Sequence, residues 1–261
     1  MKKLIMIKLG GSVITEKSKP YTVRRTNLEF LAEQLSQIEQ LKKNTNEQII
    51  IGHGAGSFGH YAVHTHGLET AHAIEQVQRS VLRMHQEVRD VCGKQKLPLF
   101  TVQPSMLFTV SDGIVTQSQI SQVFQVLRAG GIPCVYGDVL FDDLRYAQVF
   151  STERIFSELV LAIQRSREYT VTQIIHVGTV SGVLDGLNNV ISEINQDNWP
   201  EIEQHIFQTA GYDVTGGMRH KIEESLALTQ LGITTYFVNK ENLLAVVKNE
   251  GYEGTVFRGQ S

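Results

Sequence analysis

Hydrophobic runs alternate with amphipathic segments along most of this 261-residue chain. Apolar runs at 4–9, 48–52, 98–102, 133–136, 173–178, 234–238 and 254–257 predict β-strands. Apolar positions at helical spacing predict helices over 27–42, 70–94, 117–129, 154–165, 200–209, 216–231 and 241–248. Strands and helices in alternation are typical of a parallel sheet with helices on both faces, so we expect an α/β fold.

A glycine-rich segment follows the apolar run at 49–51 and reads Gly52-His53-Gly54-Ala55-Gly56-Ser57-Phe58-Gly59-His60. Glycines after a strand let backbone N–H groups approach phosphate oxygens, because a β-carbon would block the approach. His60 stands where this loop enters a helix and can offer a bound anion a hydrogen-bond donor. The alternative interpretation is a simple glycine turn with two incidental histidines.

Two further glycine turns favour phosphate binding. Lys8 ends the first predicted strand, Gly10-Gly11-Ser12 follows, and Lys17 lies in the next polar turn. Near the other end, Asp213-Val214-Thr215-Gly216-Gly217-Met218 precedes a helix that carries Lys221. Any one lysine is more often a solvated surface residue, but Lys8 lies inside an apolar strand, where an unpaired charge is costly.

The composition limits the possible partners and location of the protein. With 24 basic and 27 acidic residues the net charge is −3, which argues against a general nucleic-acid or anionic-membrane surface. Cys92 and Cys134 are too few for a disulfide framework and indicate free thiols in a reducing compartment. No run approaches the ~20 apolar residues of a membrane helix. We therefore expect a cytoplasmic protein.

Phosphate loops that face each other suggest phosphoryl transfer between two anionic ligands. This chemistry needs positioning and charge neutralisation, which Lys8, Lys17 and Lys221 and the loop amides would supply, with Mg²⁺ arriving on the nucleotide. We expect one domain over 1–261, with an acceptor-binding half at about 1–168 and a nucleotide-binding half at about 169–261.

Several motifs together resemble a known family. Lys8-Leu9-Gly10-Gly11-Ser12 with Lys17 looks like the opening of the amino-acid kinase superfamily. The segments 53–60, 136–139 (Tyr-Gly-Asp-Val) and 213–218 resemble one branch, the isopentenyl phosphate kinases. The resemblance extends from residue 3 to about residue 257.

The resemblance implies a three-layer α/β/α sandwich, a homodimer, and transfer of the γ-phosphoryl group of ATP to isopentenyl phosphate in isoprenoid biosynthesis. It implies catalytic roles for Lys8, Lys17, His60, Lys221 and Glu153. It further implies acceptor contacts from Ala55, Gly56, Gly59, His60, Gly137, Asp138 and Thr152, and nucleotide contacts from Lys8, Gly10, Gly11, Ser12, Gly56, Thr179, Gly216, Gly217 and Lys221. No residue is assigned as a metal ligand.

A phosphate monoester acceptor fits these residues. It is already an anionic nucleophile near neutral pH, so the enzyme needs no base and instead needs a donor that offsets phosphate repulsion, which is the role expected of His60. A five-carbon tail needs an apolar slot, and the stripe Ile74, Val77, Val81 and Met84 is the candidate. The alternative for each stripe residue is ordinary core packing.

Two segments depart from the family pattern. Where the family pattern has Ser-Gly-Asp-Asp, this chain has Ser151-Thr152-Glu153-Arg154. Glu153 keeps a carboxylate that would orient two of the lysines. This segment also resembles the fosfomycin kinases. Gly178-Thr179-Val180-Ser181-Gly182 lacks two aspartates near the nucleoside. The alternatives are therefore a kinase of the same fold for a phosphonate, a nucleoside monophosphate or a small acid, and a non-catalytic nucleotide sensor.

Overall fold

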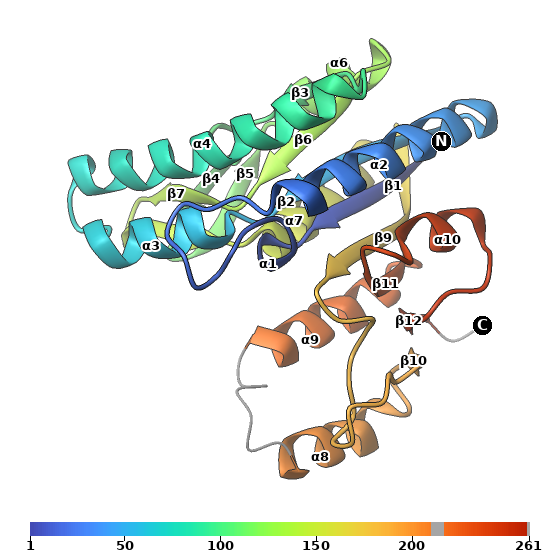
Figure 1. Cartoon of the computed structure of the whole chain (residues 1–261). Helices are drawn as coiled ribbons and strands as arrows, with labels where there is room; N and C mark the ends of the chain where they lie inside the picture. The colour runs from blue at the N-terminus through green and yellow to red at the C-terminus, as the bar shows by residue number, and fades with distance from the viewer. Residues whose placement is uncertain (210–216, 260–261) are drawn as a thin grey trace.

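Eight strands form the main sheet of the protein, whose computed structural model describes residues 1–209 and 217–259 (Figure 1). In sheet order they are β10 (Glu193–Ile194), β12 (Gly254–Phe257), β11 (Thr234–Asn239), β9 (Tyr169–Gly178), β1 (Lys2–Leu9), β2 (Glu47–His53), β6 (Ile132–Tyr136) and β3 (Leu99–Thr101). Neighbouring strands run parallel except β11 and β12, which are antiparallel. The predicted strands and the largely parallel sheet are confirmed.

The central strand β1 separates two helical layers because its side chains alternate between the faces of the sheet. Ile5 and Ile7 pack with α2 (Arg25–Thr45), α4 (Ala71–Lys94) and α10 (Leu243–Lys248). Leu4 and Met6 pack on the other face with α6 (Ser121–Arg128), α7 (Thr152–Ser166) and α9 (Gly217–Thr229). The α/β/α sandwich is thus confirmed.

The shorter helices complete the chain. They are α1 (Gly11–Ile14), α3 (Gly56–His66), α5 (Pro104–Leu107) and α8 (Trp199–Thr209). The separate helix α3, which carries His60, is an addition to the predicted elements and ends at Gly67, whose φ is +70°. Within the described part of the chain, none of the helices combines the length and apolarity needed to cross a membrane.

A second, four-stranded sheet was missed by the sequence analysis. It consists of β5 (Ile114–Ser118), β4 (Phe108–Ser111), β7 (Asp138–Asp142) and β8 (Tyr146–Phe150), in that order. The predicted helix over 117–129 is wrong at its start, because residues 114–118 form β5 and the helix spans only 121–128. The signal that was missed is the Asp112-Gly113 pair, because Asp-Gly is typical of two-residue hairpin turns. In the structure both residues have the positive φ angles of such a turn (52° and 77°).

Asp142 joins the two hairpins of this small sheet. Its carboxylate accepts hydrogen bonds from the backbone N–H groups of Asp112 (3.1 Å), Gly113 (2.6 Å), Leu144 and Arg145 (2.8 Å each). Desolvation raises the pKa of Asp142, but these backbone donors outweigh it and lower that pKa to about 2. The small sheet therefore packs as one unit beside the main sheet.

Candidate active site

A cavity of about 660 Å³ lies at the carboxyl ends of β1, β2 and β9. Parallel α/β sheets bind ligands at this edge, because the loops and helix N-termini converge there. Of the predicted site residues, those that line the cavity are Lys8, Gly10, Gly11, Ser12, Lys17, Ala55, Gly56, Gly59, His60, Gly137, Asp138, Thr152, Glu153 and Lys221. The structure thus brings together residues from four distant parts of the sequence.

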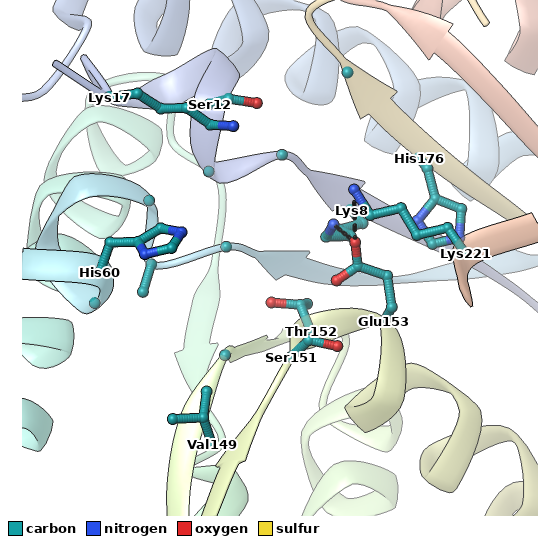
Figure 2. Close-up of a pocket in the computed structure, with 18 of the residues that line it drawn as sticks. Lys8, Ser12, Lys17, His60, Val149, Ser151, Thr152, Glu153, His176 and Lys221 are labelled. Carbon is teal, nitrogen blue, oxygen red and sulfur yellow. Dashed lines mark hydrogen bonds and ion pairs between the residues drawn. The ribbon is translucent and has the colours of Figure 1, made fainter. Parts of the chain in front are cut away.

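Lys8, Glu153 and Lys221 form an ion cluster at one end of the cavity (Figure 2). Lys8 ends β1, and its Nζ atom donates a short hydrogen bond to Oε1 of Glu153. Lys221 lies on α9, and its Nζ atom is 3.5 Å from the same oxygen. Glu153 therefore holds two ammonium groups side by side, as expected from the sequence for two of the lysines.

The cluster is charged although it is buried. Burial raises the pKa of Glu153, but the ammonium groups of Lys8 and Lys221 outweigh burial and hold that pKa well below its usual range. Burial lowers the pKa of Lys8, and Glu153 opposes that shift. A buried charge is stable only when it is paired, so this pairing explains the charged residue in an apolar strand.

His176 is a cavity residue that the sequence analysis missed. It lies on β9 directly beside Lys8 of β1 in the strand register and lines the cavity. Its Nδ1 atom is buried and has no hydrogen-bond partner among the described residues. Burial and the charge of Lys8 lower the pKa of His176 to about 3, so the ring is neutral. The signal was a polar residue in the apolar run 173–178.

The first two glycine loops meet backbone to backbone. A β-carbon on Gly11 would lie 2.6 Å from the N atom of Gly56, and one on Gly54 would lie 2.7 Å from the N atom of Gly11. Gly56 also has a φ of +53°, a conformation that side chains disfavour. Glycine is therefore required at this junction, and the loops after β1 and β2 act as one surface.

His60 and Lys17 lie across the cavity from the ion cluster (Figure 2). His60 belongs to α3, Lys17 follows α1, and both side chains are exposed to the cavity. Within the described residues, no carboxylate pairs with Lys17. The cavity thus presents a free ammonium group and an imidazole opposite the paired lysines.

The N-terminus of α7 closes the cavity floor. Thr152 donates a hydrogen bond from Oγ1 to the carbonyl oxygen of His53 (2.7 Å), so its hydroxyl is used within the protein. Asp138 accepts hydrogen bonds from the backbone N–H groups of Ser105 (3.1 Å) and Val139 (2.8 Å). Burial raises the pKa of Asp138 in spite of these donors. Substrate contacts by Thr152 and Asp138 stay predictions.

The far end of the cavity is apolar. Val77 and Val81 of α4 line it as expected, together with Val63 of α3, Val139 of β7 and Val149 of β8. Ile74 and Met84 pack in the core instead, which is the alternative given for each stripe residue. The wall from β7 and β8 went unrecognised because the small sheet was missed.

Among the described residues, one predicted nucleotide contact, Thr179, does not line the cavity. Thr179 is exposed and outside the lining, although its neighbours Gly178 and Val180 contribute to it. Gly217 begins α9, whose Met218 and Lys221 line the cavity, and contact of Gly217 with the nucleotide stays a prediction. Gly216 lies outside the described residues.

These features define an α/β/α protein with a site for a polyanionic ligand that has an apolar portion. The family model described as "Amino acid kinase family" matches residues 3–239. The chain belongs to the amino acid kinase family.

Similar proteins agree with this assignment. The isopentenyl phosphate kinase of Methanocaldococcus jannaschii is 28% identical over 231 residues, which cover 84% of this chain and 85% of that protein. The isopentenyl phosphate kinase of Methanothermobacter thermautotrophicus is 27% identical over 98% of this chain and 100% of its own. A solved isopentenyl phosphate kinase has a TM-score of 0.76 at 24% identity, covering 97% of this chain and 99% of its own, which shows the shared fold.

Proposed function

We propose that this protein is a phosphotransferase that transfers the γ-phosphoryl group of ATP to isopentenyl phosphate and forms isopentenyl diphosphate. Isopentenyl phosphate kinases of 27–28% identity match nearly its whole length. The observation that carries the proposal is one cavity that is lined both by His60 and three lysines and by the valines of α3, α4 and the small sheet. This arrangement suits an acceptor with a phosphate head and a five-carbon tail.

In this reaction an oxygen of the acceptor phosphate attacks the γ-phosphorus, and the bond from that phosphorus to the β–γ bridging oxygen breaks. A phosphate monoester is anionic near neutral pH, so no general base is needed. The main barrier is repulsion between anions, which positioned cations and N–H donors reduce. The cavity contains these groups. The carboxylates that line it among the described residues, those of Glu153 and Asp138, already accept hydrogen bonds from the protein.

Each charged group has a distinct role in this proposal. His60 donates a hydrogen bond to the acceptor phosphate, and Lys17 and Lys8 neutralise the transferring group. Lys221 contacts the terminal phosphates of the nucleotide. Glu153 contacts no substrate and acts as a positioning residue, because it holds Lys8 and Lys221 at fixed places.

The halves of the domain divide these tasks. Residues of about 1–168 supply the acceptor contacts, with Ala55, Gly56 and Gly59 at the acceptor phosphate. Residues of about 169–261 bind the nucleotide, with Gly10, Gly11 and Ser12 completing its phosphate site. Magnesium comes in bound to the nucleotide, since Glu153 and Asp138 already have protein partners. We further propose a cytoplasmic homodimer.

The test is phosphoryl transfer from Mg-ATP to isopentenyl phosphate by purified protein. His60→Ala should reduce kcat by at least about 100-fold, as expected for removing a transition-state donor, and leave ATP affinity unchanged. His60→Gln, which keeps an N–H donor, should recover part of the rate. The matched control is His66→Ala, an exposed residue of the same helix outside the cavity lining.

A panel of acceptors separates the alternatives. Higher efficiency with a phosphonate, a nucleoside monophosphate or a small acid than with isopentenyl phosphate would contradict the proposed substrate. Binding of ATP without transfer to any acceptor would contradict the proposed activity and indicate a nucleotide sensor.

A further inference from the structure

His53 and His85 form a buried hydrogen-bond chain behind the second glycine loop. Nδ1 of His53 is 3.2 Å from the carbonyl oxygen of Gly54, and Nε2 of His53 is 3.0 Å from Nδ1 of His85. Nε2 of His85 is in turn 2.8 Å from Oγ1 of Thr101 on β3. The chain thus connects three elements, namely β2, α4 and β3.

The direction of every hydrogen bond in this chain is determined. Burial lowers the pKa of His53 to about 4 and that of His85 to about 3, so each ring is neutral and has one donor and one acceptor nitrogen. The carbonyl of Gly54 can only accept, so His53 carries its proton on Nδ1. His85 must then donate from Nδ1 to His53, and Thr101 donates its hydroxyl proton to His85.

This chain determines which way a peptide group of the phosphate loop faces. His53 is buried and does not line the cavity, so the Gly54 carbonyl that bonds to its ring is directed away from the cavity. In a trans peptide the N–H group points opposite to the carbonyl, so the N–H of Ala55 points away from the His53 ring, and Gly54 and Ala55 both line the cavity. Among the described residues, no hydrogen bond within the protein occupies this N–H.

We infer that His53 and His85 are positioning residues, which hold the Gly54–Ala55 peptide with its N–H toward a phosphate oxygen of the ligand. The inference rests on the proposed function, because it assigns the Ala55 N–H to the phosphate site of that reaction. It explains why the glycine loop begins with a histidine that never touches the cavity.

A metal site is the rival explanation for the same side chains. Ligand atoms of His53, His85 and Cys134 all lie within 4.8 Å of one another and are buried. Metal binding would require Nε2 of His53 and Nδ1 of His85 to give up their mutual hydrogen bond. It would also require a thiolate, whereas burial raises the pKa of the Cys134 thiol. The hydrogen-bond chain satisfies the imidazoles without an ion.

Nitrogen NMR of the unmodified protein, labelled in its histidine rings, tests the chain directly. We expect His53 and His85 both to be neutral at pH 7 and both to carry the proton on Nδ1. A proton on Nε2 of His53 would overturn the inference. Stoichiometric zinc in the purified protein, with the hydrogen bond between the rings absent while the metal is bound, would overturn it as well.

Matched variants test the effect on binding. His53→Leu removes the donor to Gly54 and should weaken isopentenyl phosphate binding by roughly 10-fold or more, as for a lost hydrogen bond to a charged group. His53→Asn keeps an N–H near the position of Nδ1 and should restore most of the affinity. Equal losses in both variants, or none in His53→Leu, would contradict the inference.

Tyr136→Phe is the control for changes in packing. The Tyr136 ring stacks on His53 and lies tilted against His85, and its buried hydroxyl has no partner within the described chain. Removing that hydroxyl should change ligand affinity by less than about 2-fold; a loss as large as that of His53→Leu would overturn the inference. Nitrogen NMR of the histidine rings does not depend on which acceptor is phosphorylated, so this inference and the proposed function can fail separately.

Discussion

The two ends of the cavity are built in opposite ways. At one end, Glu153 of α7 pairs with the buried Lys8 of β1 and with the partly exposed Lys221 of α9. At the other end, the valines of α3, α4 and the small sheet contribute only apolar surface. A charge in a low-dielectric site needs fixed partners, whereas a hydrocarbon tail needs only a volume of the right size. Substitutions at the two ends should therefore differ in both size and kind.

Lys8→Met should have the largest effect. It removes the ammonium group that would neutralise the transferring phosphoryl group, and it leaves Glu153 with Lys221 as its remaining ammonium partner. We expect kcat/KM to fall about 1000-fold, or about 4 kcal/mol of transition-state stabilisation, and the melting temperature to fall as well. Lys3→Met on the same strand, where the lysine is exposed, is the control and should change neither. A loss of less than about tenfold for Lys8→Met would contradict the role of the cluster.

Val77→Phe should have a smaller effect that is confined to the acceptor. The larger ring fills the apolar end, so kcat/KM for isopentenyl phosphate should fall about 10-fold, as for other overpacked sites, while the KM for ATP stays unchanged. Leu82→Phe, at a half-exposed position of the same helix outside the cavity lining, serves as the control. If Val77→Phe raises the KM for ATP as much as the KM for the acceptor, the apolar end of the cavity does not serve the acceptor alone.

The buried histidines predict that the stability of the protein depends on pH. The pKa values of His53, His85 and His176 are lowered to about 4, 3 and 3, below the usual 6.5 of an unfolded chain. Above pH 6.5 these histidines are neutral in both the folded and the unfolded protein, so they do not make the free energy of unfolding depend on pH. Between pH 6.5 and 4.5 the unfolded chain binds more protons, so each histidine lowers the free energy of unfolding by up to about 1.4 kcal/mol per pH unit.

Urea unfolding at pH 7, 6 and 5 measures this dependence. His176→Phe should make the slope shallower because it removes one of the buried rings, whereas the exposed His66→Ala should leave the slope unchanged. Constant stability across this range would contradict the lowered pKa values of these rings in the folded protein. Glu153, with its lowered pKa, contributes stability above about pH 4.5 and loses it only at lower pH.

The sequence predicted the charged end of the cavity better than the apolar end, for a physical reason. A lysine in an apolar strand and glycines after a strand are local signals, so Lys8, Gly11 and Gly56 could be identified from short segments. The small sheet gave a weaker local signal, because residues 117–129 also fit a helical spacing and obscured the hairpin at Asp112-Gly113. Val139 and Val149 were missed with that sheet.

Contacts between distant segments were even harder to predict from the sequence. Nothing in the local sequence at Glu153 specifies that it binds Lys8 and Lys221, which lie 145 residues before it and on α9 after it. His176 became recognisable only when the register placed it beside Lys8. Thr179, a position inferred from a resemblance, lies outside the cavity lining between two residues that belong to it, so its contact with the nucleotide stays a prediction.

The direct contact between Gly11 and Gly56 also determines a length. Because no side chain separates the loops after β1 and β2, the loops stay about as far apart as two paired strands, roughly 4.8 Å. Two anions bound by these loops would be spaced by the hydrogen-bond ladder of the sheet, and no rotamer change could alter that spacing. The strand spacing of the β-sheet would then set the distance between the reacting groups of an in-line reaction.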